Sequence, residues 1–219
     1  MALLPFRCPL SNKEIEARLV NLNTLDRTDL RLVCKDREKL FRLVKYYTTD
    51  ICGTDQGYIH MSIFNDLFGW SIPSRESVEK IVDFIGEDKV LEIGGGRGLW
   101  SRLLQESGID VICTSKSIHY SQRDPYRDRN NTSWTTVHKM KADEAIRKYS
   151  DRNVIFISWG MYSLDFLMKF RGRKVVIVGE GDSGCTSYLR DGQFGFQQVG
   201  EIEIPRWFLR EDKIRLYQW

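Results

Sequence analysis

A glycine-rich segment constrains this chain more than any other feature, because it joins a buried strand directly to a helix. The run Val90–Ile93 is apolar apart from Glu92, and glycines at positions 94, 95, 96 and 98 separate it from the helical pattern that begins at Leu99. Glycine suits such a turn, because the backbone must adopt positive φ and approach a ligand without a Cβ in the way. The segment therefore predicts a strand–turn–helix unit of an open α/β sheet.

Apolar strand patterns alternate with helical patterns over most of the remaining chain. Ser74 reads as a helix N-cap after Pro73, and the alternation continues from there to the strand that ends near residue 180. It implies a parallel sheet with right-handed crossovers, whereas the last two strands have no helix between them and predict an antiparallel hairpin. We expect an α/β, Rossmann-like, seven-strand, mostly parallel sheet, with strands at 89–94, 110–115, 134–137, 153–159, 174–180, 196–204 and 213–219 and helices at 74–84, 99–107, 142–149 and 163–170.

The first 60 residues have a different pattern. They are polar, and apolar residues recur at helical spacing between about residues 12 and 47, which predicts two or three amphipathic helices. We expect residues 1–60 to form a helical N-terminal extension and residues 61–219 to form the sheet domain. The extension is either a cap that stabilises the main domain or a lid that recognises the substrate.

Composition excludes several classes of protein. The chain has 219 residues, and its apolar runs are far shorter than the roughly 18 to 20 residues of a membrane span. The N-terminus lacks the basic region of a signal peptide, so we expect a soluble, cytoplasmic protein without a membrane partner. A net charge of +3 is weak for a dedicated nucleic-acid clamp. The cysteines and histidines have no metal-ligand spacing, so we expect reduced thiols and no metal site.

An acidic residue stands two positions before the first glycine of the turn. The glycines follow the pattern G-x-G-x-G, whereas NAD-binding turns place the third glycine three residues after the second. Glu92 would repel a pyrophosphate and favour a cationic ligand, such as the sulfonium and amino group of S-adenosylmethionine. The segment resembles motif I of class I S-adenosylmethionine-dependent methyltransferases, (D/E)-x-G-x-G-x-G. A Rossmann turn that binds no cofactor, or a different one, is the alternative.

The resemblance covers about residues 57–219 and is closer to one poorly characterised, methyltransferase-like branch of that superfamily. The branch's W-x-I-P block corresponds to Trp70–Pro73, and its C-W-P-P-Y block falls at Ser158–Tyr162. Its G-E-G-x-G-G-C-T block is similar to Gly179–Thr186, and its I-P-x-W block to Ile204–Trp207. Several blocks in the same order imply the methyltransferase fold with S-adenosylmethionine as cofactor.

Two departures from the family pattern bear on activity. Class I methyltransferases usually end the second strand with an acid that holds the ribose hydroxyls, whereas Ser115 or Thr114 here offers only a weaker, neutral hydrogen bond. Both prolines of the loop after the fourth strand are replaced, by Gly160 and Met161, which weakens the case for ordinary amino-group methylation. Tyr162 remains, and it would stack on a planar target.

The resemblance implies a set of site residues. Asp143 would contact the adenine amine, and Trp159 would flank adenine or substrate, although a helix N-terminal charge and a core aromatic are their structural alternatives. Tyr162 and Glu180 are the predicted catalytic residues, which position the substrate. The predicted cofactor-binding residues are Glu92, Gly94, Gly95, Gly96, Gly98, Ser115, Asp143 and Trp159.

Three functions remain open from the sequence. The first is a methyltransferase that acts on an unidentified acceptor. The second is a catalytically inactive, methyltransferase-like binding or regulatory protein, favoured by the missing acid and prolines. The third is an RNA or DNA methyltransferase or RNA-binding accessory protein, favoured by the arginine- and tyrosine-rich stretch at 119–129.

Overall fold

The computed structural model describes residues 69–116, 133–160, 163–180, 188–190, 192–206 and 210–219. The expected helical extension over residues 1–60, the stretch at 119–129 and Tyr162 lie outside these ranges. The strands are β1 Val90–Ile93, β2 Val111–Ser115, β3 Val137–Lys139, β4 Val154–Ser158, β5 Lys174–Gly179, β6 Gln197–Glu203 and β7 Lys213–Gln218. The helices are α5 Arg75–Ile85, α6 Leu99–Glu106 and α7 Ala142–Lys148, with 3₁₀ helices η2 Asp165–Lys169 and η3 Gln193–Gly195.

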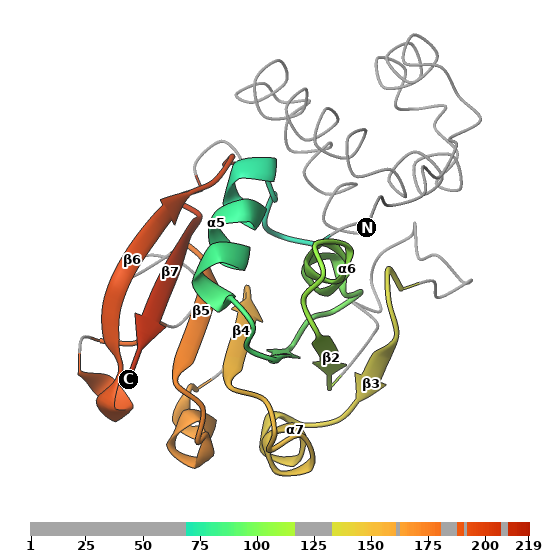
Figure 1. Ribbon diagram of the computed structural model, residues 1–219, viewed down its shortest axis with the longest axis vertical. Coiled ribbons are helices and arrows are strands. Elements are labelled where there is room, and N and C mark those ends of the chain that lie inside the picture. The colour runs from blue at the N-terminus through green and yellow to red at the C-terminus, as the bar shows by residue number, and fades with distance from the viewer. Residues whose placement is uncertain (1–68, 117–132, 161–162, 181–187, 191, 207–209) are drawn as a thin grey trace, which may run out of the picture.

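The seven strands form one sheet in the order β3-β2-β1-β4-β5-β7-β6 (Figure 1). The strands from β1 to β5 pair in parallel, while β7 runs antiparallel to both β5 and β6. This is the expected Rossmann-like, mostly parallel sheet with a C-terminal antiparallel hairpin. The N-cap at Ser74 is confirmed too, since its side chain accepts a hydrogen bond from the Ser77 N–H.

Two elements differ from expectation. The third strand begins at Val137 rather than at Trp134, because the Trp134 N–H donates to the Arg97 carbonyl at 2.8 Å and ties that stretch to the glycine turn. The helix expected at 163–170 is the 3₁₀ helix η2. Leu164, Leu167 and Phe170 are buried at a spacing of three residues, which matches the three residues per turn of a 3₁₀ helix.

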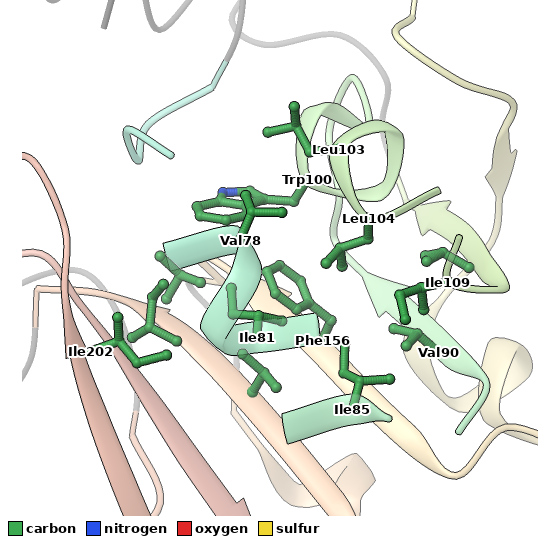
Figure 2. Packing of buried hydrophobic residues seen from close by; sticks show 14 of the residues in the cluster. Val78, Ile81, Ile85, Val90, Trp100, Leu103, Leu104, Ile109, Phe156 and Ile202 are labelled. Atoms are coloured by element: carbon green, nitrogen blue, oxygen red, sulfur yellow. The ribbon is translucent and has the colours of Figure 1, made fainter. Parts of the chain in front are cut away.

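Alternate side chains of the central strands enter two apolar layers. Val90 and Phe156 pack with α5 and α6 on one face of the sheet, as Figure 2 shows. Leu91 and Ile155 pack with α7 and η2 on the other face. Figure 1 shows the same division, with α5 and α6 on one side of the sheet and α7 on the other. Burial on both faces explains why these strands read as continuous apolar runs.

The strand order reverses between β1 and β4. The chain moves outward from β1 to β2 and β3, then returns to place β4 on the opposite side of β1. Open α/β sheets bind ligands outside the carboxyl ends of the strands at such a switch point. The fold therefore predicts a ligand site among the residues that follow β1, β2, β3 and β4.

Candidate functional site

The glycine turn has the backbone that its sequence predicts. Gly94, Gly96 and Gly98 have φ values of 73°, 56° and 78°, in the left-handed region that side chains disfavour. The Gly95 N–H donates to the Thr114 carbonyl at 3.0 Å, and the Gly98 N–H donates to the Gly95 carbonyl at 2.7 Å. The turn is thus fixed both to the end of β2 and to its own helix, of which Gly98 is the N-cap.

Gly95 is required for a different reason, since its φ is ordinary but its surroundings leave no room. A Cβ at this position would lie 2.5 Å from the Cys113 Sγ and 2.7 Å from the Glu92 Cδ. The turn therefore packs directly on the Glu92 side chain. The contact with Cys113 comes from the neighbouring strand β2, so it could not be predicted from the local sequence.

Glu92 is buried beneath the turn, with 1% of its surface exposed. Its carboxylate accepts hydrogen bonds from the Ser101 N–H, at 3.1 Å, and from the Ser101 hydroxyl. Burial raises the pKa of this carboxyl, and the bonds from Ser101 act in the opposite direction. The side chain thereby holds the first turn of α6 against β1. Its contact with the methionine portion of a cofactor stays a prediction.

A pocket of about 370 Å³ opens at the carboxyl ends of β1, β2 and β3. It lies at the switch point, next to the glycine turn, and η2 closes its other side. Its lining includes the predicted Gly94 and Asp143 together with Lys116, Met140, Lys141 and Phe166. The volume falls within the range of small-molecule sites, and the lining combines apolar surface with a few charged groups.

The residues predicted to contact the ribose stand at the end of β2, and that role stays a prediction. Thr114 donates its hydroxyl to the Glu92 carbonyl at 2.8 Å, and Ser115 is buried. The next residue, Lys116, lines the pocket. The sequence reasoning missed Lys116, although its position directly after the second strand was the available signal. Asp143 also lines the pocket, and it pairs with Lys169 of η2 at 3.1 Å.

A second group of polar residues lies at the same edge of the sheet, beyond β4. Trp159 follows β4 with a φ of 52° and stacks on Trp70, with 5.4 Å between the ring centroids. Glu180 follows β5 and is buried, and its Oε1 lies 2.9 Å from the Arg210 Nη1. The structure thus brings the predicted Trp159 and Glu180 together, apart from the pocket that Gly94 and Asp143 line.

Asp212 completes this second group, although nothing in the sequence singled it out. It precedes β7 and is fully buried. Burial and the charge of Glu180 raise the pKa of its carboxyl to about 7. In the sequence it belongs to a polar run that reads as a solvated turn, so its burial could not be seen there.

No group of three or more potential ligands able to hold a metal ion is found within the described ranges. In those same ranges, no helix has the length and apolar character needed to span a membrane. Cys113, the free cysteine of the described residues, is buried, and burial together with the Glu92 charge raises the pKa of its thiol.

Comparison with known proteins gives similarity of structure only. No family model matches the chain, and no curated protein matches its sequence. Magnesium protoporphyrin IX methyltransferase from Synechocystis PCC 6803, with bound SAM, is 10% identical over 82% of this chain and 96% of that chain, with a TM-score of 0.47. Mitomycin 7-O-methyltransferase MmcR is 10% identical over 80% of this chain and 59% of that chain, with a TM-score of 0.41. The methyltransferase domain of bacterial CtHen1-CN is 13% identical over 66% of this chain and 96% of that chain, with a TM-score of 0.39. At these values the similarity assigns no activity or substrate to this chain.

Proposed function

We propose that this chain binds S-adenosylmethionine and transfers its methyl group to a nucleophilic acceptor. One observation supports this most strongly: a pocket at the strand-order switch point is bordered by a glycine turn with positive φ. The buried acid of the strand before the turn, Glu92, supports the proposal only indirectly, because it holds the first turn of α6 in place next to the pocket.

The residues present fit this cofactor. A lining with apolar and charged groups suits a ligand that has an adenine ring at one end and an amino acid at the other. Gly94 offers a backbone that a ligand can approach closely, and Asp143 would accept the hydrogen bonds of the adenine amine. Ser115 or Lys116 would contact the ribose in place of the usual acid. When bound, the cofactor supplies a methyl group activated by a sulfonium.

Methyl transfer is a displacement in which the acceptor attacks the methyl group and the sulfonium leaves. The chain's own residues would act mainly by positioning the acceptor and the cofactor, which supplies much of the rate enhancement of such a reaction. Glu180 and Tyr162 are the proposed substrate-positioning residues. Residues 61–219 would form the catalytic domain, and residues 1–60 would form its helical extension.

A binding protein without catalysis is the second candidate, and two observations favour it. Lys116 lines the pocket directly after β2, near the point where methyltransferases usually carry an acid, and Glu180 is already engaged by Arg210. Nucleic acid remains a candidate acceptor, because Lys116 and Lys141 line the pocket. The affinity of the chain for a nucleic acid would then fall steeply as the salt concentration rises.

Calorimetric titration tests the proposal, with NAD⁺ as the rival ligand. We expect saturable, one-to-one binding of S-adenosylmethionine and no binding of NAD⁺. Gly94→Ala should weaken binding at least about tenfold, because a Cβ at positive φ would distort the wall of the pocket. Gly86→Ala is the matched control, since Gly86 has a φ of 64° with open space around it and does not line the pocket.

Two results would contradict the proposal. One is the absence of any heat with S-adenosylmethionine up to millimolar concentration in a folded sample. The other is equal weakening by Gly94→Ala and Gly86→Ala, which would trace the effect to lost stability rather than to the pocket. Binding without methyl transfer to any tested acceptor would favour the binding-protein alternative.

A further inference from the structure

A cluster of polar and aromatic side chains, three of them buried, lies at the carboxyl edge of the sheet, outside the cofactor pocket. We name it the Asp212 cluster; it consists of Trp70, Trp159, Glu180, Arg210 and Asp212. Trp159 follows β4 and Glu180 follows β5. Because β7 is antiparallel and Lys213 pairs with Gly179, Asp212 arrives at the same edge, beside Glu180. The cluster thus occupies the half of the edge next to the half that contains the pocket.

Asp212 is the charged residue of this cluster that no contact balances. The Arg210 guanidinium lies against Glu180 at 2.9 Å, but it makes no ion pair with Asp212. The charge of Arg206 lowers the pKa of the Asp212 carboxyl without an ion pair between the two residues. The Arg206 Nη2 instead lies 3.6 Å from the Glu203 Oε2. Both oxygens of Asp212 are buried and lack a hydrogen-bond partner in the described part of the chain. A buried carboxylate without a partner is costly, so a group that remains so calls for a ligand or another explanation.

Trp159 brings a second buried polar group to the same place, next to Asp212. Its indole N–H is also buried without a partner of standard geometry among the described residues. It is nevertheless close enough to Asp212 to oppose part of the rise in the pKa of that carboxyl. The ring stacks on Trp70, and the Arg210 guanidinium carbon lies 5.7 Å from its centroid. The aromatic surface thus already accepts a cation, as an indole face does.

We propose that the Asp212 cluster binds the methyl acceptor as a protonated amine, and that Asp212 takes up the proton which the amine must lose before it can act as a nucleophile. This inference rests on the proposed function, and it assigns an amine to the Asp212 cluster although the replacement of both prolines, by Gly160 and Met161, argues against ordinary amino-group methylation at the loop after β4. An ammonium group supplies the missing positive charge and donates hydrogen bonds to the orphaned oxygens of Asp212. In the proton transfer, one N–H bond breaks and one O–H bond forms on Asp212, which leaves a neutral amine with a free electron pair.

The titration of Asp212 agrees with this role. Its pKa of about 7 lets the carboxylate take up and release a proton near neutral pH, which suits a general base. The charged groups that act on it are Glu180, which raises its pKa, and Arg210 and Arg206, which lower it. Amine binding should therefore strengthen as the pH rises from about 6 to about 8, because only the ionised carboxylate attracts the ammonium.

An NMR titration of the full chain with bound S-adenosylhomocysteine tests the inference. The probe is n-butylamine, which has the side chain of lysine and stays protonated up to a pKa of about 10. Its neutral counterpart is n-butanol. The chain has six tryptophans, and Trp159→Phe identifies the indole N–H signal of Trp159 by its disappearance. We expect n-butylamine to shift that signal saturably and n-butanol to leave it in place.

Two variants separate binding from structure. Asp212→Asn keeps the shape of the side chain but removes its charge, and it should weaken n-butylamine binding at least about tenfold. Glu211→Gln makes the same change at the exposed neighbouring residue, so it should leave binding unchanged. An equal response to n-butanol, or unchanged amine binding in Asp212→Asn, would overturn the inference.

Binding of S-adenosylhomocysteine is measured first, by calorimetry, in every variant. If it binds but n-butylamine does not, the amine inference is wrong and the proposed function stands. If S-adenosylhomocysteine itself fails to bind the wild-type chain, the proposed function fails, and the amine site fails with it.

Discussion

At the scale of single residues, the two most informative carboxylates are both buried and differ in their partners. Glu92 accepts two hydrogen bonds from Ser101 at the first turn of α6, so its burial is compensated. Asp212 has no such compensation, since neither of its oxygens has a partner in the described ranges. The first therefore acts as part of the fold, whereas the second weakens the fold whenever it is ionised.

Asp212 should make the stability of the protein depend on pH. Its pKa in the folded chain, about 7, exceeds the ordinary value of 3.8, so the native state binds more protons than the unfolded state between these values. Stability should fall as the pH rises from about 4 through about 7. Asp212→Asn removes this loss. Above about pH 8, the free energy of unfolding of this variant should exceed that of the wild type by at least about 2 kcal/mol.

Urea unfolding at several pH values measures this difference. Glu211→Gln serves as control, because Glu211 is exposed and the change removes the same charge. The two chains, wild type and Asp212→Asn, should have similar stability near pH 4 and diverge as the pH increases. Parallel pH profiles would show that the Asp212 carboxyl is not perturbed by the fold.

The conformation of residues that depend on the local backbone could be predicted from the sequence. The burial and neighbours of residues that depend on distant contacts could not. The positive φ of Gly94, Gly96 and Gly98 follows from a strand that turns directly into a helix. Asp212 stands in a polar run, and only the pairing of β7 with β5 places it beside Glu180. Lys116 is an intermediate case. Its position directly after the second strand could be predicted from the sequence, but its place in the wall of the pocket could not.

At the scale of elements, one side chain joins the start of β5 to the end of α5. The Lys174 Nζ lies 2.8 Å from the Asp88 carboxylate and donates to the Ile85 carbonyl at 3.0 Å. It also lies 5.4 Å from the centroid of the Phe84 ring. A cation at the C-terminal end of a helix interacts favourably with the helix dipole and satisfies a free carbonyl.

Lys174→Met should lower the free energy of unfolding by about 1 to 2 kcal/mol at neutral pH, because the charge and two polar contacts are lost. The hydrogen bond from Lys174 holds the pKa of the Asp88 carboxyl below its usual range. The difference between the chains should therefore shrink as the pH falls through the folded pKa of Asp88.

Urea unfolding of Lys80→Met provides the comparison. Lys80 pairs with Glu76 at 2.7 Å, but both side chains are largely exposed, so we expect no measurable loss. Equal losses in the two variants would show that the position of Lys174 at the end of α5 has no special effect.

The elements themselves were predicted well where a strong apolar period decided them, and less well elsewhere. The buried strands β1, β4 and β5 agree with expectation to within a residue at either end. The start of β3 was placed too early, because a hydrogen bond to the glycine turn diverts Trp134. The helix after β4 is a 3₁₀ helix, a distinction that depends on how Leu164, Leu167 and Phe170 pack on the sheet.

At the scale of the whole molecule, the strand order divides the carboxyl edge of the sheet into two halves. The ends of β1, β2 and β3 form the pocket proposed for the cofactor. The ends of β4 and β5, together with the start of the antiparallel β7, form the Asp212 cluster. The halves meet between β1 and β4, where the order reverses. The antiparallel hairpin therefore contributes Asp212 to the half proposed for the acceptor.

A crystal structure of the chain with S-adenosylhomocysteine tests the central claim most directly. We predict electron density for the adenine and ribose in the pocket lined by Gly94, Lys116, Met140 and Asp143, with the amino-acid end directed along the glycine turn toward β4. Density at a different edge of the sheet, or no density at a ligand concentration that saturates other S-adenosylmethionine sites, would contradict the assignment of this pocket to the cofactor.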